Sequence, residues 1–279
     1  MKGIALITGT SSGIGLHAAI SLGRAGFTVV ATMRDPGKAG SLKEAASAAG
    51  IEVDVRRLDV RDSASIETCV EEVVQRHGSV DILVNNAGSG FLGALEETTA
   101  EDLAAVMDVN FFGVWRVTQA VLPFMRAAQA GRIVTVTSVG GLIGQPFNDA
   151  YCAAKFAVEG FMESLAPVAQ RLGIRVCLIE PGPVHTEFIA AVQKRRFEGS
   201  AGVAAYDKMR EAYLAGVEQA YAAIGQSGAD IAAVIADAAC AENPHFRYAT
   251  SDAIRGLLAR KYVDPTGDSI LALAGARLP

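Results

Sequence analysis

The feature that most constrains the fold of this chain is a regular alternation of short apolar segments with longer segments of helical periodicity. Most of the short segments are rich in β-branched residues and alternate little with polar ones, which is typical of strands buried on both faces of a parallel sheet. We expect strands at Ile4–Thr8, Thr28–Thr32, Glu52–Leu58, Asp81–Asn85, Arg132–Ser138, Arg175–Glu180 and Phe246–Thr250. This alternation predicts an α/β fold built on a doubly wound parallel sheet.

Helical spacing is found between the expected strands, at Ile14–Ala25, Lys38–Ala49, Ser63–His77, Ala100–Ala128, Ala150–Leu172 and Ala229–Ala241. A glycine often stands just past a helix and just before a strand, where its left-handed conformation can end the helix; these glycines are Gly26, Gly50, Gly78, Gly131 and Gly173. We expect a single domain over residues 1–279. The segment 183–227 departs from the pattern, and we interpret it as a helical substrate lid, with an ordinary surface helix pair as the alternative.

Charge and hydropathy disfavour several classes of function. The chain has 25 basic and 30 acidic residues, a net charge of −5, and no basic tract, which disfavours binding to nucleic acid or to an anionic membrane. No apolar run approaches the ~18 residues of a membrane span, and the start of the chain lacks the pattern of a secretory signal. The four cysteines are scattered, so we expect free thiols, a cytoplasmic protein and no metal.

A glycine-rich loop follows the first expected strand. The sequence TGTSSGIG spans residues 8–15 and places Gly9, Gly13 and Gly15 between a strand and a helix. Glycine there permits a tight turn and lets backbone amides approach a pyrophosphate, while the helix N-terminus adds a partial positive charge. The hydroxyls of Ser11 and Ser12 could add donors. The loop predicts dinucleotide binding, and a plain turn between strand and helix is the alternative.

The second strand bears on the choice between NADP and NAD. We place its tip at Met33, followed by Arg34, in the sequence ATMRD. A guanidinium suits a 2′-phosphate, whereas an acidic residue at the tip would bind the ribose hydroxyl of NAD. NADP is therefore favoured. NAD stays possible, because a register shift of two residues would bring Asp35 to the tip.

Two further strand ends carry candidate cofactor contacts. Asp59, in the sequence LDV after the third strand, could accept a hydrogen bond from the adenine amino group. The sequence NNAG at 85–88 follows the fourth strand, and its small residues would leave room for the cofactor. An ordinary loop with turn chemistry is the alternative for NNAG.

The segment PFNDAYCAAKFAVEGF places Tyr151 and Lys155 four residues apart, on one face of an expected helix. A free tyrosine ionises near ~10, and a nearby ammonium favours the phenolate and lowers that pKa. Such a tyrosine can exchange a proton with a carbonyl or alcohol oxygen. Ser138, at the end of a strand, could bind the same oxygen and stabilise negative charge on it. Chance spacing on an ordinary helix is the alternative for the pair.

In combination, these motifs resemble the main branch of the short-chain dehydrogenase/reductase family. The matching pieces occur in family order over about residues 3–190: TGTSSGIG, LDV, NNAG, MDVNFFG, TVTSVGG, YCAAK and PGPVHT. The longer matches ATMRDP, LDVRDS, GGLIGQPFNDAYCAAKFAVEGFMESLA and GPVHTEF resemble the 17β-hydroxysteroid and retinol dehydrogenase subgroup more closely. The segment between His185 and Asn243 departs from that subgroup. There, Gly216 stands where the estrogen-acting member has a histidine, which bears on substrate specificity.

The resemblance implies a Rossmann-type fold and NADP(H)-dependent hydride transfer to or from a hydrophobic ketone, aldehyde or secondary alcohol, with steroids and retinoids as candidates. It implies that Asn110 holds a water linking Lys155 to solvent, and that Thr186 binds the nicotinamide carboxamide. It adds to the expected cofactor contacts Ile14, Val60, Asn86, Ala87, Gly88, Tyr151, Lys155, Pro181, Gly182 and Val184. By family habit it implies a homodimer or homotetramer.

Three other functions stay open from the sequence. A sugar-nucleotide epimerase or dehydratase also uses a tyrosine and a lysine four residues apart, but usually with a longer chain and a different glycine spacing. A non-catalytic NADP-binding regulator would keep the glycine loop. A structural protein would bind no nucleotide at all.

Overall fold

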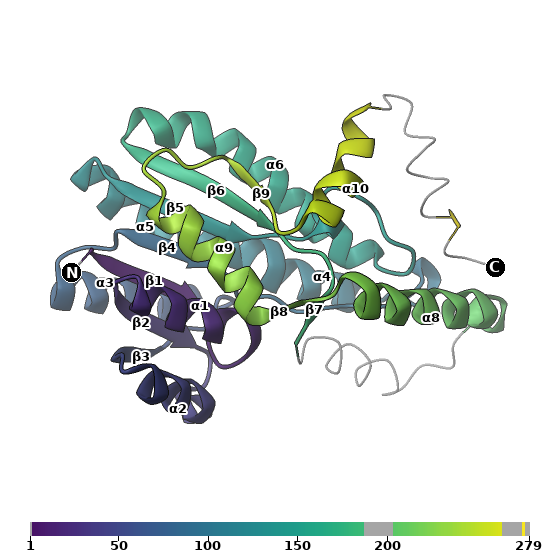
Figure 1. Ribbon diagram of the computed structural model, residues 1–279, viewed down its shortest axis with the longest axis horizontal. Helices are drawn as coiled ribbons and strands as arrows, with labels where there is room; N and C mark the ends of the chain where they lie inside the picture. The colour runs from purple at the N-terminus through teal and green to yellow at the C-terminus, as the bar shows by residue number, and fades with distance from the viewer. Residues whose placement is uncertain (1, 187–202, 264–274, 277–279) are drawn as a thin grey trace.

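The computed structural model describes residues 2–186, 203–263 and 275–276. At its centre is a parallel sheet of seven strands in the order β3-β2-β1-β4-β5-β6-β9 (Figure 1). The strands are β1 Ile4–Thr8, β2 Thr28–Met33, β3 Val53–Arg57, β4 Ile82–Asn85, β5 Gly131–Val136, β6 Ile174–Glu180 and β9 Arg247–Ala249. The doubly wound parallel sheet is confirmed, and the order reverses between β1 and β4.

Helices cover both faces of the sheet. They are α1 Gly13–Arg24, α2 Gly40–Ala49, α3 Ser63–His77, α4 Ala100–Met107, α5 Gly113–Ala128, α6 Asp149–Arg171, α8 Asp207–Ile224, α9 Gly228–Cys240 and α10 Asp252–Val263. Short 3-10 turns lie at η1 Pro36–Lys38, η2 Leu95–Glu97, η4 Val139–Gly141 and η5 Ala204–Tyr206. No helix among the described residues is both long enough and apolar enough to span a bilayer.

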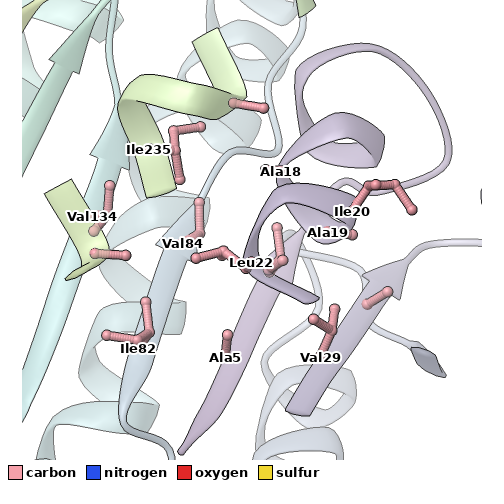
Figure 2. Packing of buried hydrophobic residues seen from close by; sticks show 14 of the residues in the cluster. Ala5, Ala18, Ala19, Ile20, Leu22, Val29, Ile82, Val84, Val134 and Ile235 are labelled. Carbon is pink, nitrogen blue, oxygen red and sulfur yellow. The ribbon is translucent and has the colours of Figure 1, made fainter. Parts of the chain in front are cut away.

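Two hydrophobic cores form because successive strand side chains point to opposite faces of the sheet. On β1, Ala5 and Ile7 pack with residues of α1, α2 and α9, whereas Ile4 and Leu6 pack with residues of α3, α5 and α6. Figure 2 shows the first core, where Leu22 of α1 and Ile235 of α9 lie over strand side chains. Burial on both faces explains why these strands lack polar alternation in the sequence.

The structure differs from the sequence expectation in three segments. The single helix expected at 100–128 is α4 and α5 joined by a π-helical turn, η3 Asp108–Phe112. Within 183–227, the structure has β7 Val184–His185 paired in parallel with β8 Gln226–Ser227, and α8 between them in sequence. Residues 187–202 of the expected lid lie outside the described residues. Helix α10 was not expected, because it buries only two apolar residues, Ile254 and Leu258.

Candidate active site

The glycine loop joins β1 to α1 beside the point where the strand order reverses, a position where α/β sheets bind ligands. Gly9 has a φ of +72°, and a Cβ built there would lie 2.8 Å from the Cα of Ala87. A Cβ at Gly15 would lie 2.2 Å from the carbonyl oxygen of Gly9. These short distances leave no room for a side chain at either position. The loop can therefore close against β4 and α1 only with glycine at 9 and 15.

The NNAG segment is tied directly to this loop. The hydroxyl oxygen of Thr8 accepts from the backbone N–H groups of Asn86 and Ala87, both at 3.0 Å. The side-chain amide of Asn86 donates to the carbonyls of Thr8 at 2.9 Å and of Gly9 at 3.0 Å. These bonds connect the ends of β1 and β4. The role of Thr8 was missed in the sequence because threonine at a strand end carries no distinctive signal.

The loop fits the pyrophosphate of a dinucleotide. Ser12 is the N-cap of α1, but its side chain makes no capping hydrogen bond, and the first turn of the helix contains no acidic residue. The first N–H groups of a helix have no intrahelical partner and carry partial positive charge. They are therefore available to an anion. Thr186 lies close by, since a Cβ at Gly13 would be 3.3 Å from its methyl carbon.

On the neighbouring strand, β2 ends at the buried Met33, and Arg34 and Asp35 that follow are exposed. The placement of the strand tip at Met33 is thus confirmed. The carboxylate of Asp35 accepts from the backbone N–H of Gly37 at 2.9 Å and caps the η1 turn. One oxygen of Asp35 is held by this turn, and the side chains of both Arg34 and Asp35 are exposed beyond the strand tip.

Asp59 makes contacts that the sequence did not indicate. Its two carboxylate oxygens accept from Arg61, at 3.0 Å to Nε and 2.7 Å to Nη2. These hydrogen bonds, opposed by burial and aided by Arg34, lower the pKa of Asp59 to about 2. Val60 is turned towards α5, because a Cβ at Gly113 would lie 2.9 Å from its side chain. The structure therefore gives both residues protein partners at the end of β3.

Ser138, Tyr151 and Lys155 come together beyond the end of β5. Ser138 is the N-cap of η4, where its hydroxyl oxygen accepts from the N–H of Gly140 at 3.0 Å, and it also hydrogen-bonds to Tyr151. Lys155 is buried, its Nζ lies 5.8 Å from the centroid of the Tyr151 ring, and it donates to the carbonyl of Val136 at 3.1 Å. The i, i+4 spacing thus produces the neighbourhood expected from the sequence.

The electrostatics of this group differ from the sequence expectation. Burial raises the pKa of Tyr151, and the hydrogen bond from Ser138 opposes that increase. Burial also lowers the pKa of Lys155 to about 8, while the nearby charge of Glu159 acts in the opposite direction. In the protein alone, the pKa of Tyr151 is therefore raised by desolvation rather than lowered, and Lys155 is not among the groups that shift it.

Asn110 is fully buried in the π-helical turn η3. Its amide nitrogen donates to the carbonyls of Ser89 at 2.8 Å and Val106 at 3.0 Å, and its amide oxygen accepts from the N–H of Ser89 at 3.1 Å. A Cβ at Gly88 would lie 3.0 Å from this oxygen and 3.9 Å from Lys155 Nζ. The side chains of Asn110 and Lys155 thus both lie close to Gly88.

The remaining expected contacts surround this centre. The carbonyl of Pro181 accepts from Val139 N–H at 2.8 Å, next to Ser138. Gly182 packs against Ile254 of α10, since a Cβ there would lie 2.3 Å from that side chain. Val184 is in β7, and Ile14 is half-buried against the core of α1. Ser11 and Ser12 lie half-buried in the glycine loop.

Helix α8 contributes site residues that sequence reasoning did not identify. The hydroxyl of Tyr213 accepts from the side-chain amide of Asn148 at 2.9 Å, just before the start of α6. The Tyr213 ring packs on Phe147, with ring centroids 5.8 Å apart. Tyr221 lies near enough to Tyr151 to contribute to its raised pKa. The tyrosine spacing along 206–221 was the available signal. Within the described residues, no group of three or more metal-ligating side chains occurs.

Comparison with known proteins gives a consistent result. The model of the short chain dehydrogenase family matches residues 3–196. The chain is 41% identical over 274 residues to human 17-beta-hydroxysteroid dehydrogenase type 1, covering 95% of this chain and 83% of that protein. It is 42% identical over 271 residues to bovine retinol dehydrogenase 8, covering 94% of this chain and 86% of that protein.

Solved structures share the fold. A short-chain dehydrogenase from Streptomyces avermitilis superposes with a TM-score of 0.80 at 30% identity, over 97% of this chain and 95% of that one. A family member from Burkholderia phymatum in complex with NAD has a TM-score of 0.79 at 28% identity, over 94% and 93% of the two chains. A metagenomic short-chain oxidoreductase in complex with NADP has a TM-score of 0.69 at 27% identity, over 89% and 96%. Both nucleotides therefore occur among similar structures.

Proposed function

Since this chain belongs to the short-chain dehydrogenase family, we propose that it transfers hydride between NADP(H) and a hydrophobic ketone or aldehyde, or the corresponding alcohol. The observation that carries the proposal is the grouping of Ser138, Tyr151 and Lys155 beside the glycine loop. No described feature of the site favours a sugar-nucleotide epimerase or a non-catalytic regulator.

The proposed chemistry assigns a role to each of four residues. The nicotinamide, when bound, exchanges hydride with the substrate carbon. The hydroxyl of Tyr151 gives its proton to the carbonyl oxygen during reduction and takes it from the alcohol during oxidation. The hydroxyl of Ser138 donates a hydrogen bond to the same oxygen and stabilises its developing negative charge. The Lys155 ammonium favours the phenolate form of Tyr151, and Asn110 holds the water that connects Lys155 to solvent.

We assign cofactor binding to the residues around the glycine loop and the neighbouring strand ends: Gly9, Ser11, Ser12, Gly13, Ile14, Gly15, Arg34, Asp59, Val60, Asn86, Ala87, Gly88, Tyr151, Lys155, Pro181, Gly182, Val184 and Thr186. Preference for NADP over NAD is assigned to Arg34. Its guanidinium is exposed directly after the strand tip, and one oxygen of the neighbouring Asp35 carboxylate is held by the N–H of Gly37.

The substrate is assigned to the hydrophobic class, with steroids and retinoids as candidates, because the two relatives named above carry those substrates in their names. The apolar cluster of Ala94, Phe147 and Tyr213, where α8 packs beside the start of α6, supports this assignment. We further propose one Rossmann-type domain over 1–279 with its lid at 183–227, a cytoplasmic location, and a homodimer or homotetramer formed through α4 to α6. Exposed aromatic rings at Phe112 and Trp115 support such an interface.

The first test follows the absorbance of reduced nicotinamide with NADPH and a panel of hydrophobic ketones, aldehydes, a steroid and retinal. Tyr151→Phe removes the proton donor without removing the ring, so we expect a loss of at least about 100-fold in turnover. Tyr248→Phe is the matched control: it also removes one tyrosine hydroxyl, but that hydroxyl accepts from the backbone N–H of His245 at 3.0 Å and has no proposed catalytic role. Equal turnover of the wild type and Tyr151→Phe would contradict the proposed mechanism.

The second test concerns the choice of nucleotide. Arg34→Gln should weaken NADPH binding by about tenfold or more and leave NADH binding unchanged, because only NADPH carries the 2′-phosphate that the guanidinium would pair with. Arg24→Gln, at the exposed end of α1, is the matched charge control. Tighter binding of NADH than of NADPH by the wild type would refute the assignment of Arg34.

A further inference from the structure

A buried carboxylate lies one helical turn beyond the Tyr151–Lys155 pair. Tyr151, Lys155 and Glu159 follow each other at four-residue spacing on α6, which places their side chains along one stripe of the helix. Glu159 is only 4% exposed. The chemistry proposed above makes no use of it.

One oxygen of Glu159 has a partner and the other has none. Oε2 pairs with Arg247 of β9, and the same guanidinium binds Glu180 of β6 at 2.7 Å and the exposed Glu163 at 2.8 Å. Oε1 is buried and makes no close hydrogen bond among the described residues, although the hydroxyl of Thr137, which donates to the Ile179 carbonyl at 3.1 Å, lies near enough to lower the pKa of Glu159. Leaving a buried carboxylate oxygen unpaired costs free energy, so its retention requires an explanation beyond the ion pair with Arg247.

The contacts of Glu159 fit its ionised form. Arg247, which faces Oε2, can only donate hydrogen bonds and cannot accept a proton from a neutral acid. Burial, together with the charge of Glu180, raises the pKa of Glu159, and the hydroxyl of Thr137 and the guanidinium of Arg247 oppose this effect.

The unpaired oxygen lies against η4, the turn that follows Ser138. A Cβ at Gly141 of η4 would be 3.3 Å from Glu159 Oε1 and 3.2 Å from the carbonyl oxygen of Lys155. Glu159 therefore packs against the turn that carries Lys155 and against the segment that follows Ser138. Lys155 has donated one bond to a neutral carbonyl, that of Val136, and the charge acting on it is that of Glu159.

The other charged or titratable groups around Glu159 come from each element packed against it. They are Glu180 of β6, Arg247 of β9, Glu163 on α6 itself, and Lys261 and Tyr262 of α10. Arg247 is shared among three carboxylates, so its charge compensates Glu159 only in part. A net negative field from Glu159 thus remains to act on the buried Lys155 ammonium.

We propose that Glu159 is a positioning residue for proton transfer, whose buried carboxylate keeps Lys155 in the ammonium form beside Tyr151. The inference rests on the roles proposed for Tyr151 and Lys155. It accounts for the unpaired oxygen, since a carboxylate whose second oxygen is left without a donor retains more of its field at Lys155 than a fully hydrogen-bonded one.

The experiment compares three single substitutions that each remove one carboxylate from Arg247. In Glu159→Gln the ammonium of Lys155 loses its stabilising charge, so the alkaline limb of the pH–rate profile for alcohol oxidation should move ~1 pH unit to lower pH. Glu180→Gln breaks the same buried cluster from β6, so it should lower stability, and it should move the alkaline limb by less than Glu159→Gln does, because Glu180 acts on Lys155 only through the cluster. Glu163→Gln, whose carboxylate is exposed, should alter neither.

A second readout does not need turnover. Because Lys155 is among the proposed cofactor contacts, the alkaline loss of NADPH binding should also begin at lower pH in Glu159→Gln than in the wild type. A wild type that turns over no substrate of the panel would count against the proposed function alone, and the binding profile would still decide the role of Glu159.

Two outcomes would overturn the inference. One is a Glu159→Gln variant that is destabilised as Glu180→Gln is, yet keeps the wild-type alkaline limb in both profiles. The other is failure to fold of both Glu159→Gln and Glu159→Met, which would make Glu159 a structural residue. Recovery of the wild-type alkaline limb in Glu159→Asp, which keeps the charge, would support it.

Discussion

The ion pair between Glu97 and Arg210 offers the sharpest test of how α8 is held against the rest of the site. The two side chains are 10% and 8% exposed, and Nη2 of Arg210 contacts both carboxylate oxygens of Glu97. Glu97 also accepts from the backbone N–H of Val203 at 2.9 Å and of Ala94 at 3.3 Å. The Arg210 guanidinium lies 5.8 Å from the Phe147 ring, close to the start of α6.

Arg210→Met removes the cation and leaves the carboxylate buried. Breaking a buried pair by removing one partner costs about 3–5 kcal/mol, and the two backbone N–H groups at Glu97 place this case near the lower end, at about 3 kcal/mol. Asp207→Asn is the matched control. Its carboxylate is 56% exposed and 3.8 Å from Arg210, so its loss should cost below about 1 kcal/mol.

The assay is equilibrium urea unfolding followed by circular dichroism, on the wild type, Arg210→Met, Glu97→Leu and the double variant. Because each single variant leaves one charge buried and unpaired, the double variant should cost at least about 2 kcal/mol less than the sum of the single ones. A loss below about 1 kcal/mol in Arg210→Met, or additive losses in the cycle, would refute the reasoning.

Three further predictions follow from the loop and from Glu97. Gly15→Ala should abolish NADPH binding, because the new Cβ would lie 2.2 Å from the Gly9 carbonyl; Gly40→Ala, with no atom within 4 Å, should bind NADPH normally. Thr8→Val should lower the free energy of unfolding by about 1–3 kcal/mol in urea titrations, because two backbone N–H groups lose their acceptor. Burial raises the pKa of Glu97, but the hydrogen bonds from Arg210 and from the backbone have the larger combined effect. The pKa of Glu97 is therefore lowered from its ordinary value of 4.5. The stabilisation from Glu97 should therefore be complete above pH 4.5 and be lost as the pH falls through the lowered pKa, and urea midpoints should show a smaller acid loss in Glu97→Gln.

Each of these three has an outcome that would contradict it. Unchanged NADPH affinity in Gly15→Ala would mean that the loop adopts another conformation. A Thr8→Val variant as stable as the wild type would show that the two N–H groups find other acceptors. Parallel acid unfolding of Glu97→Gln and the wild type would place the titration elsewhere.

Elements whose signals are local could be predicted from the sequence. The strands of the sheet could be predicted because burial on both faces removes polar alternation, and the left-handed glycines Gly50 and Gly78 do end α2 and α3. The glycine loop and the pairing of Tyr151 with Lys155 could also be predicted. Backbone conformation and the i, i+4 spacing depend only on residues that are close in sequence.

Contacts between residues far apart in the chain became visible only in the folded structure. Arg247 reaches Glu159 from 88 positions away, and Arg210 reaches Glu97 from 113 positions away. Neither pair has a spacing that a local pattern could reveal, because strand order and helix packing determine which elements meet. The sequence predicted a lowered pKa for Tyr151, and this prediction is wrong in the protein alone for the same reason: helical spacing gives the position of Lys155, whereas burial, which raises the pKa, is a property of the assembled fold.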